Sequence, residues 1–312
     1  MKLYIVMSVI ALVVAGVTTR FSQADDSTVG GELRVLIIDG HNPYHDWQVT
    51  TPLLKQILEA SGRFTVDVAT APVPDGYQCS TGEPPPPVDN HDFRPRFADY
   101  DVVVGNYVGP RWPAETEQEF VAFVAGGGGY VSVHAADNAF PDWPEYSLMT
   151  GVGGWYGRDE NSGPHVYLDD DGNEIRDTSP GSAGHHGPQH EYRVRIRDSE
   201  HPITRGLPPL WMHTKDELYD TLRGPAQNMH MLATAYSDPA FSGTGKHEPM
   251  LATLTYGRGR IFHTMMGHAD YSMKCVGFET TLRRGTEWAA NGNVTIPVPE
   301  DFPTADKSST SQ

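Results

Sequence analysis

The chain contains the nearly continuous apolar stretch Leu33-Arg34-Val35-Leu36-Ile37-Ile38-Asp39. A central strand of a parallel sheet has this composition because both of its faces are buried. The segments Asp101-Val-Val-Val-Gly-Asn106 and Tyr130-Val-Ser-Val-His134 repeat the pattern, and Phe64 to Ala69 is a further candidate strand. These segments predict the buried core of a β-sheet.

Segments with helical spacing lie between these strands. Apolar side chains at three- and four-residue steps predict a helix from about residue 50 to Gly62, and Pro113 suits the first turn of another. Strand and helix therefore alternate, which predicts an α/β fold with a doubly wound, mostly parallel, flavodoxin-like sheet. Ligands bind beyond the carboxyl ends of such strands, so the loops after Asp39, Asn106 and Val133 should share one edge.

The second half of the chain is rich in loops. We expect a loop-rich insertion over residues 151–227, in which Tyr192 to Ile196 alternates like an antiparallel strand. Two apolar segments flank Gly257-Arg258-Gly259 and predict a C-terminal β-hairpin, and a last helix is predicted from Val276 to Ala290. These elements make one α/β domain over residues 33–295. A linker over 25–32 precedes it, and a disordered Pro- and Ser-rich tail over 296–312 follows it.

The N-terminus has the features of an export signal. Lys2 precedes an apolar stretch from Leu3 to Val17, and Ser22-Gln23-Ala24 places small residues where signal peptidase cleaves. We therefore expect a signal peptide over residues 1–24 and a secreted or periplasmic protein. The apolar stretch is short for a bilayer span, so no stable span is expected after cleavage; an uncleaved anchor is the alternative.

Charge and cysteine content restrict the partners. The formal net charge is −17, with no basic cluster, which argues against nucleic acid and favours a neutral or cationic small molecule. Cys79 and Cys275 are the two cysteines of the chain. An oxidising compartment permits a disulfide between them, but their spacing neither requires one nor makes a zinc site.

Four polar segments adjoin the predicted strands and contain the candidate chemistry. They are His41-Asn-Pro-Tyr-His-Asp-Trp47, Gly126-Gly-Gly-Gly-Tyr-Val-Ser-Val-His-Ala-Ala136, Asp216-Glu-Leu-Tyr219 and Gly267-His-Ala-Asp270. With Glu200-His-Pro-Ile-Thr-Arg-Gly-Leu207, Gly257-Arg-Gly-Arg-Ile-Phe262 and Arg284-Gly-Thr-Glu-Trp-Ala-Ala290 they resemble the ThuA-like family, named for a bacterial trehalose utilisation protein. The resemblance extends over residues 33–292, with the segments in the order of the family.

The resemblance implies a fold similar to class I glutamine amidotransferases. Those enzymes carry a cysteine on a sharp turn after a Gly-rich strand, and the equivalent residue here is His134. Histidine cannot form the thioester that glutamine hydrolysis needs, so we expect no glutaminase activity. The loop after Asp39 also lacks the closely spaced glycines of a dinucleotide site, so no nucleotide cofactor is expected.

His134 is the central candidate residue. We predict that His134, Asp216 and Glu217 are catalytic, and that His45, His134, Glu217 and His268 form a metal site. Imidazole and carboxylate ligands suit a divalent transition metal, with zinc favoured, and a histidine also suits general base catalysis. The alternatives are a buried, hydrogen-bonded His134, a helix N-terminal turn at 216–217, and simple packing of His45.

Aromatic residues and other histidines are weaker candidates. Trp47, Trp112 and Trp155 are predicted to stack on sugar rings, with packing against the core as the alternative. His185, His186 and His190 lie in a Gly- and Pro-rich insertion and are expected to be solvated. The segment 169–173 is expected to be a turn, because it lacks most of a calcium-loop ligand set.

The sequence therefore suggests an exported enzyme that acts on a carbohydrate or keto-sugar derivative by acid–base or metal-assisted chemistry. The sugar class comes from the family resemblance. Hydrolase, lyase and isomerase reactions all remain open, because each uses a base positioned beside a carbonyl. The alternative is a non-catalytic sugar-binding or scaffold domain on the same fold. The oligomeric state is open.

Overall fold

The computed structural model describes residues 31–74, 76–77 and 88–311. The chain divides into two units, Met1–Gly31 and Glu32–Gln312, and the description below concerns the second. The expected signal peptide, Cys79 and the prolines of residues 84–87 lie outside the described residues. None of the helices within the described ranges is long and apolar enough to cross a membrane.

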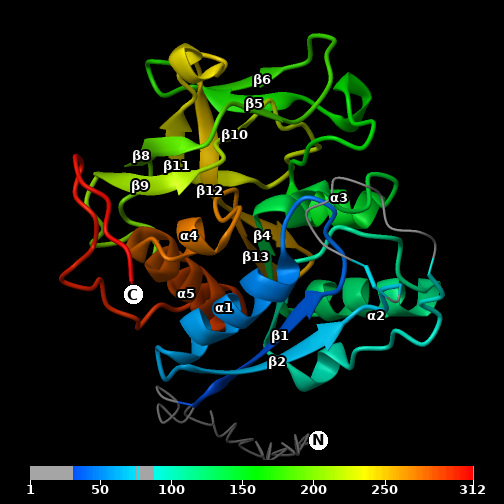
Figure 1. The fold of residues 1–312 in the computed structure, drawn as a ribbon. Coiled ribbons are helices and arrows are strands. Elements are labelled where there is room, and N and C mark those ends of the chain that lie inside the picture. Colours follow the sequence, from blue (N-terminus) through cyan, green and yellow to red (C-terminus); the bar gives the residue numbers. More distant parts are fainter. Residues whose placement is uncertain (1–30, 75, 78–87, 312) are drawn as a thin grey trace, which may run out of the picture. The chain divides into compact units, whose positions relative to one another are not determined.

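One mixed sheet organises the described part of the chain (Figure 1). Its first half is parallel, in the order β2 (Phe64–Thr70), β1 (Leu33–Asp39), β3 (Val102–Gly105), β4 (Gly129–Val133) and β13 (Gly259–Thr264). It continues antiparallel through β12 (His247–Tyr256), β11 (His230–Tyr236), β8 (His190–Ile196) and β9 (Leu210–Asp216). A hairpin of β5 (His165–Leu168) and β6 (Glu174–Asp177) extends from β12, and β7 (His185–His186) pairs separately with β10 (Tyr219–Asp220).

The parallel core and the β12–β13 hairpin are confirmed, but the sheet is not fully parallel. Strands β5, β6, β9 and β11 lie where the sequence predicts loops or nothing regular. Strands β5 and β6 have four residues each, and β9 mixes apolar and polar residues, so their local patterns are weak. Strand β11 has seven residues and is mostly buried, so its composition is compatible with a strand. The turn at residues 169–173 is confirmed as the link between β5 and β6, with Asp169 accepting hydrogen bonds from Asn173.

The helices cover both faces of the parallel half. Figure 1 shows α1 (Trp47–Glu59) and α5 (Val276–Asn291) side by side, and α2 (Ala114–Ala125) on the other side of the strands with α3 (Pro144–Thr150). Right-handed crossovers require this arrangement, because β2 and β4 lie on opposite sides of β1 in the sheet. The short helix α4 (Asp270–Met273) precedes α5, and 3-10 turns occur at Phe97–Asp99, His134–Asn138, Glu160–Ser162 and Pro239–Phe241.

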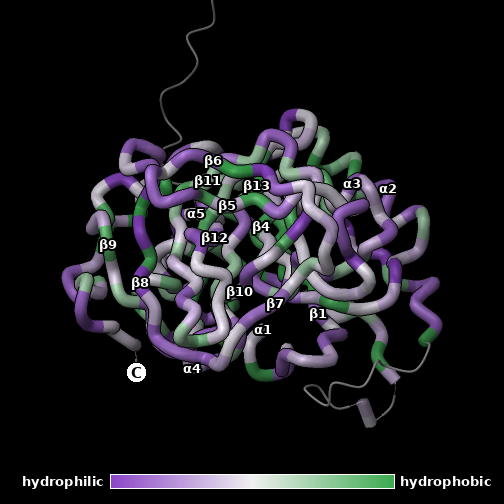
Figure 2. Tube along the Cα trace, turned by 90° about the horizontal axis from the view of Figure 1, so that it is seen from above, coloured by the Kyte–Doolittle hydropathy of each residue, from purple (hydrophilic) through white to green (hydrophobic). Residues whose placement is uncertain are grey.

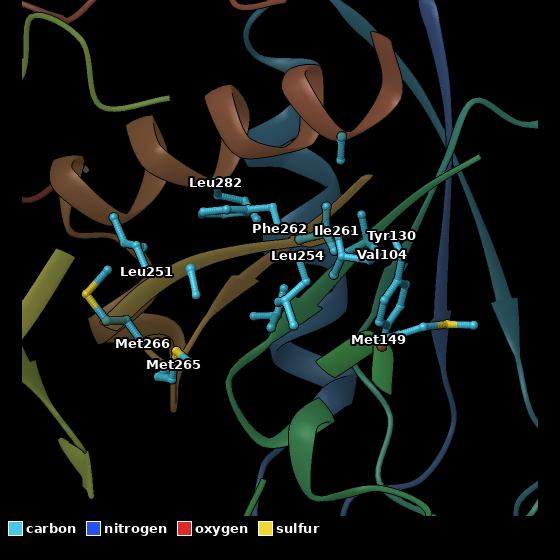
Figure 3. Packing of buried hydrophobic residues seen from close by; sticks show 14 of the residues in the cluster. Val104, Tyr130, Met149, Leu251, Leu254, Ile261, Phe262, Met265, Met266 and Leu282 are labelled. Atoms are coloured by element: carbon cyan, nitrogen blue, oxygen red, sulfur yellow. The ribbon is translucent and has the colours of Figure 1, made fainter. Parts of the chain in front are cut away.

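The core lies between these helices and the central strands. Figure 3 shows Leu282 of α5 close to Phe262 of β13, and Met149 of α3 near Tyr130 of β4. A Cβ added at Gly285 would lie 2.1 Å from Phe262 Cδ1, so glycine there lets α5 approach the sheet. Figure 2 shows hydrophobic stretches concentrated among the central strands, with many hydrophilic stretches at the periphery.

The segment after α5 differs from the loose tail that its composition predicts. It has no helix or regular strand, but it packs along the edge strand β9 and the start of α5. The Met212 amide donates to Thr304 O, and the Val276 amide donates to Ser309 O. Phe302 is buried against Trp211. The tail therefore satisfies backbone groups of an edge strand that would otherwise be open to pairing with other chains.

Candidate metal centre

The four predicted metal ligands lie together at one end of the sheet. His134 directly follows β4, His268 lies beyond β13, and His45 lies in the loop after β1. Glu217 follows β9, and its side chain reaches the same place. One ligand atom from each residue lies within 4.8 Å of those of the others. The parallel strands therefore bring residues that are far apart in sequence to one shared edge.

Glu217 lies at the centre of this group. Its Oε2 is 3.0 Å from His268 Nδ1, 3.6 Å from His134 Nε2 and 3.9 Å from His45 Nε2. Its Oε1 faces the other way, 3.3 Å from Gln189 Nε2 and 3.6 Å from His186 Nε2. One carboxylate oxygen is thus surrounded by three imidazoles, and the other by side chains of the β7–β8 region.

Hydrogen bonds on the far side of two imidazoles orient them. His45 Nδ1 donates to Asn42 Oδ1 at 2.8 Å, and the same oxygen accepts from the His45 backbone amide. His134 Nδ1 donates to the carbonyl of Met265 at 2.7 Å. A carbonyl oxygen only accepts, so each Nδ1 carries the proton and each Nε2 has its lone pair on the side of Glu217 when the ring is neutral. His45 Nε2 also accepts a long hydrogen bond from the Tyr219 hydroxyl, at 3.4 Å.

Two imidazole nitrogens of the group lack a hydrogen bond. Among the described residues, His134 Nε2 and His268 Nδ1 are buried side-chain nitrogens without a hydrogen-bond partner. Leaving a buried polar atom unpaired costs about 1–3 kcal/mol, so such atoms are usually ligands of something or are hydrogen-bonded. Their position around Glu217 Oε2 fits a bound cation.

His134 sits on a strained turn. Its φ is +45°, in the left-handed region that non-glycine residues seldom occupy, at the junction between β4 and a 3-10 turn. This conformation directs the imidazole to the end of the sheet. The ring also stacks on Tyr219, with ring centres 4.0 Å apart and planes 28° apart. The alternative that His134 is a buried, hydrogen-bonded histidine describes its Nδ1 but not its Nε2.

Asp216 is not a member of the group, although the sequence predicts it as catalytic. It is fully buried, and its carboxylate accepts hydrogen bonds from the backbone amides of Glu217, Gly267 and His268 and from His213 Nε2. Burial disfavours its charge, but the His213 hydrogen bond and the other partners lower the pKa of Asp216. Asp216 therefore joins the two loops that carry Glu217 and His268. It ends a strand and does not begin a helix, so the alternative of a helix N-terminal turn is wrong.

Burial and mutual proximity determine the charges in the group. Burial lowers the pKa of His45 to about 3, although Glu217 opposes the shift. Burial also disfavours the Glu217 carboxylate, but its interactions with the adjacent imidazoles of His134, His268 and His45 outweigh it and hold the pKa of Glu217 far below its usual range. Burial opposes protonation of His134 too, yet Glu217 and Asp216 raise its pKa. The group thus combines a firmly ionised carboxylate with a neutral His45.

A cavity of about 270 Å³ opens onto the group. Its walls include His45, Glu217 and His268 together with Tyr219, Trp155 and His186. The sequence predicts that His186 is solvated, but pairing of β7 with β10 places it opposite Tyr219 at the cavity. A two-residue strand leaves no periodic signal, so this position could not be inferred from the sequence. His185 and His190 do not line the cavity: His185 binds Asp220, and His190 stacks on Phe241.

The predicted sugar-stacking tryptophans separate into two groups. Trp155 lines the cavity, with its ring centre 4.7 Å from that of Tyr219. Trp112 is buried among Phe97, Phe120 and other rings, so its faces are not available to a ligand. Trp47 begins α1 and does not line the cavity. For Trp112 the packing alternative describes the structure, because its apolar indole fills the core. Trp47 is partly buried and is not part of that core.

Comparison with known proteins agrees with this fold. Residues 34–289 match the model of the ThuA family, described as trehalose utilisation. A crystal structure of a ThuA-like protein from Parabacteroides merdae ATCC 43184 is 47% identical, with a TM-score of 0.83, and the match covers 90% of this chain and 98% of that one. A ThuA-like protein from Bacteroides uniformis ATCC 8492 is 15% identical, with a TM-score of 0.54, and the match covers 84% and 93% of the two chains. No curated protein matches. The chain therefore belongs to the ThuA family.

Proposed function

We propose that this protein is an exported, metal-dependent enzyme that acts on a carbohydrate or keto-sugar derivative. One observation carries the proposal: three imidazoles and one carboxylate converge, with two Nε2 lone pairs directed inward and two nitrogens left without hydrogen bonds. Structural packing alone does not need this arrangement. A divalent cation would satisfy every one of these atoms.

The ligand set favours zinc or a similar transition metal. Tetrahedral zinc with bonds of about 2.0–2.1 Å has donor atoms roughly 3.3 Å apart. The separations of 3.0, 3.6 and 3.9 Å from Glu217 Oε2 to the three imidazoles are close to this value. His45, His134, His268 and Glu217 would hold the metal, and the adjoining cavity gives substrate access to it.

The chemistry proposed is acid–base or metal-assisted. A bound metal would polarise a substrate carbonyl or hydroxyl oxygen. The protein groups supply orientation: the partly exposed Trp155 offers a ring face to the apolar face of a sugar, and Glu217 Oε1 and His186 lie at the same cavity. Hydrolysis, elimination and isomerisation all fit such a site. The sugar class rests on the family description, trehalose utilisation.

The scaffold supports a relation to class I glutamine amidotransferases without their reaction. We propose that the strained turn of His134 after β4 corresponds to the position where those enzymes carry a cysteine. An imidazole there cannot form a thioester, so we propose no glutaminase activity. No nucleotide cofactor is proposed, because Asp39-Gly40-His41-Asn42 lacks a dinucleotide-binding glycine pattern.

Export belongs to the same proposal and rests on residues 1–24 alone. N-terminal sequencing of the protein from its native host should begin near Asp25. Intact Met1 in a cytosolic fraction would contradict export and would leave the metal site unaffected.

Elemental analysis tests the enzyme proposal. Protein purified without chelators should contain close to one equivalent of a divalent transition metal, and turnover of keto-sugar or disaccharide substrates should stop after chelation and return on adding metal. A protein that binds sugars with the same affinity before and after chelation, and turns none of them over, would instead be a sugar-binding module.

A further inference from the structure

A second cavity adjoins the metal pocket and differs from it in chemistry. Its volume is about 240 Å³. Val108, Asn138 and Tyr156 line both cavities, so the two are neighbours that share a wall. Nothing in the structure assigns a ligand to the second cavity.

The walls of this cavity are almost entirely apolar. They include Pro43, Pro110, Phe140 and Pro141, and none of the lining residues is charged. The polar side chains among them are Asn138 and Tyr156, and Asn138 Oδ1 already accepts a hydrogen bond from the Gly154 amide. The lining of this cavity is therefore uncharged, although the chain has a net charge of −17 and the adjacent site contains three histidines and a glutamate.

This chemistry selects an apolar occupant. A second sugar ring would bring several hydroxyl groups to walls that offer few hydrogen-bond partners, and burying an unpaired hydroxyl is unfavourable. An aromatic or aliphatic group has no hydrogen bonds to lose there, and burial of its apolar surface favours binding. Because Tyr156 lines both cavities, the cavities adjoin, and one molecule can extend from one to the other.

We propose that the apolar cavity is a subsite for an aromatic or aliphatic group attached to the sugar, that is, the aglycone of a glycoside. The proposal rests on the proposed function for the position of the sugar part, which lies at the metal centre. The substrate class is then a glycoside with an apolar aglycone, and a disaccharide is the poorer ligand.

Isothermal titration calorimetry with three glucosides tests this inference. Phenyl glucoside should bind the purified protein about 10- to 100-fold more tightly than methyl glucoside, because the ring buries apolar surface. Trehalose should bind no better than methyl glucoside. Equal affinity for the phenyl and methyl compounds, or tighter binding of trehalose, would overturn the subsite.

A pair of matched variants locates the effect. Pro110→Asp places a charge on a wall of the apolar cavity only, and should abolish the preference for phenyl glucoside while methyl glucoside binding stays unchanged. Pro208→Asp is the control, at a proline that is also partly buried but lies in the turn before β9. It should leave both affinities unchanged. A preference for phenyl glucoside that survives Pro110→Asp would overturn the assignment to this cavity.

A fragment soak separates failure of this inference from failure of the proposed function. Phenol soaked into crystals should lie against Phe140 and Pro110 whether or not glucosides bind. Absence of glucoside binding and of metal, with phenol in the cavity, would refute the proposed function and support the apolar subsite. Crystals without phenol in this cavity, together with no preference for phenyl glucoside, would refute the subsite alone.

Discussion

The carboxylates of Asp216 and Glu217 face different surroundings although the residues are consecutive. Asp216 accepts three backbone amides and His213, whereas Glu217 Oε2 faces three imidazoles. Alternation along an extended segment directs neighbouring side chains to opposite sides. The first carboxylate therefore holds the loops together, and the second is free to act at the site.

Removal of a ligand should remove the metal. His134→Ala and Glu217→Gln each delete one donor from the group, so we expect metal affinity to fall by at least a hundredfold, beyond the 10- to 100-fold typical of residues behind the ligands. Competition with a chromophoric chelator measures this affinity. His230→Ala is the control, because His230 is exposed, bonds Asp198 and is not a member of the group. Normal metal content in both ligand variants would contradict the proposed site.

Asn42 should affect metal affinity without touching the metal. Its Oδ1 fixes the orientation and the tautomer of His45, so Asn42→Ala is expected to weaken binding by about 10- to 100-fold. Asn42→Asp keeps an acceptor at this position and should retain most of the affinity. The same chelator competition applies to both. Equal loss in the two variants would contradict the role of Asn42 Oδ1 as the acceptor that orients His45.

Asp216→Ala should destabilise the fold. The change leaves three backbone amides and His213 without their acceptor in a fully buried position, which predicts a loss of roughly 3 kcal/mol or more in the free energy of unfolding. Urea denaturation in the presence of a chelator measures this loss apart from metal binding. Asp171→Ala, in the exposed turn between β5 and β6, should change stability by less than about 0.5 kcal/mol.

Arg284 should be a second large contributor to stability. Its buried guanidinium donates to the carbonyls of Pro202, Ile203, Arg205 and Ile296, and so joins α5 to the 200–207 segment and to the start of the tail. We expect Arg284→Ala to cost about 2–4 kcal/mol, because four carbonyls lose a charged donor. Thermal unfolding should show the loss, while Arg96→Ala, at an exposed arginine, should have little effect. A small loss of stability in Arg284→Ala would mean that water donates hydrogen bonds to the four carbonyls in place of the guanidinium.

Part of the site follows from local pattern. The buried strands ending at Asp39 and Val133, and the hairpin before His268, are visible as apolar runs, and parallel strands place their ends together. The grouping of three histidines could therefore be predicted. The tail over 296–312 could not, because its order comes from hydrogen bonds to β9 and α5, which composition does not reveal.

The sequence by itself determined the parallel half of the sheet and the family, because continuous apolar strands and ordered motifs are local properties of the chain. Only the tertiary structure decided that Glu217 and not Asp216 joins the histidines, that His186 and Trp155 reach the cavity, and that Trp112 is buried. The positions of Glu217 and His186 depend on β9 pairing with β8 and β10 with β7, whereas Trp112 is buried by contacts with Phe97 and Phe120. Such pairings join short, partly polar segments across long loops, and the energy that selects them arises only when the whole sheet is assembled.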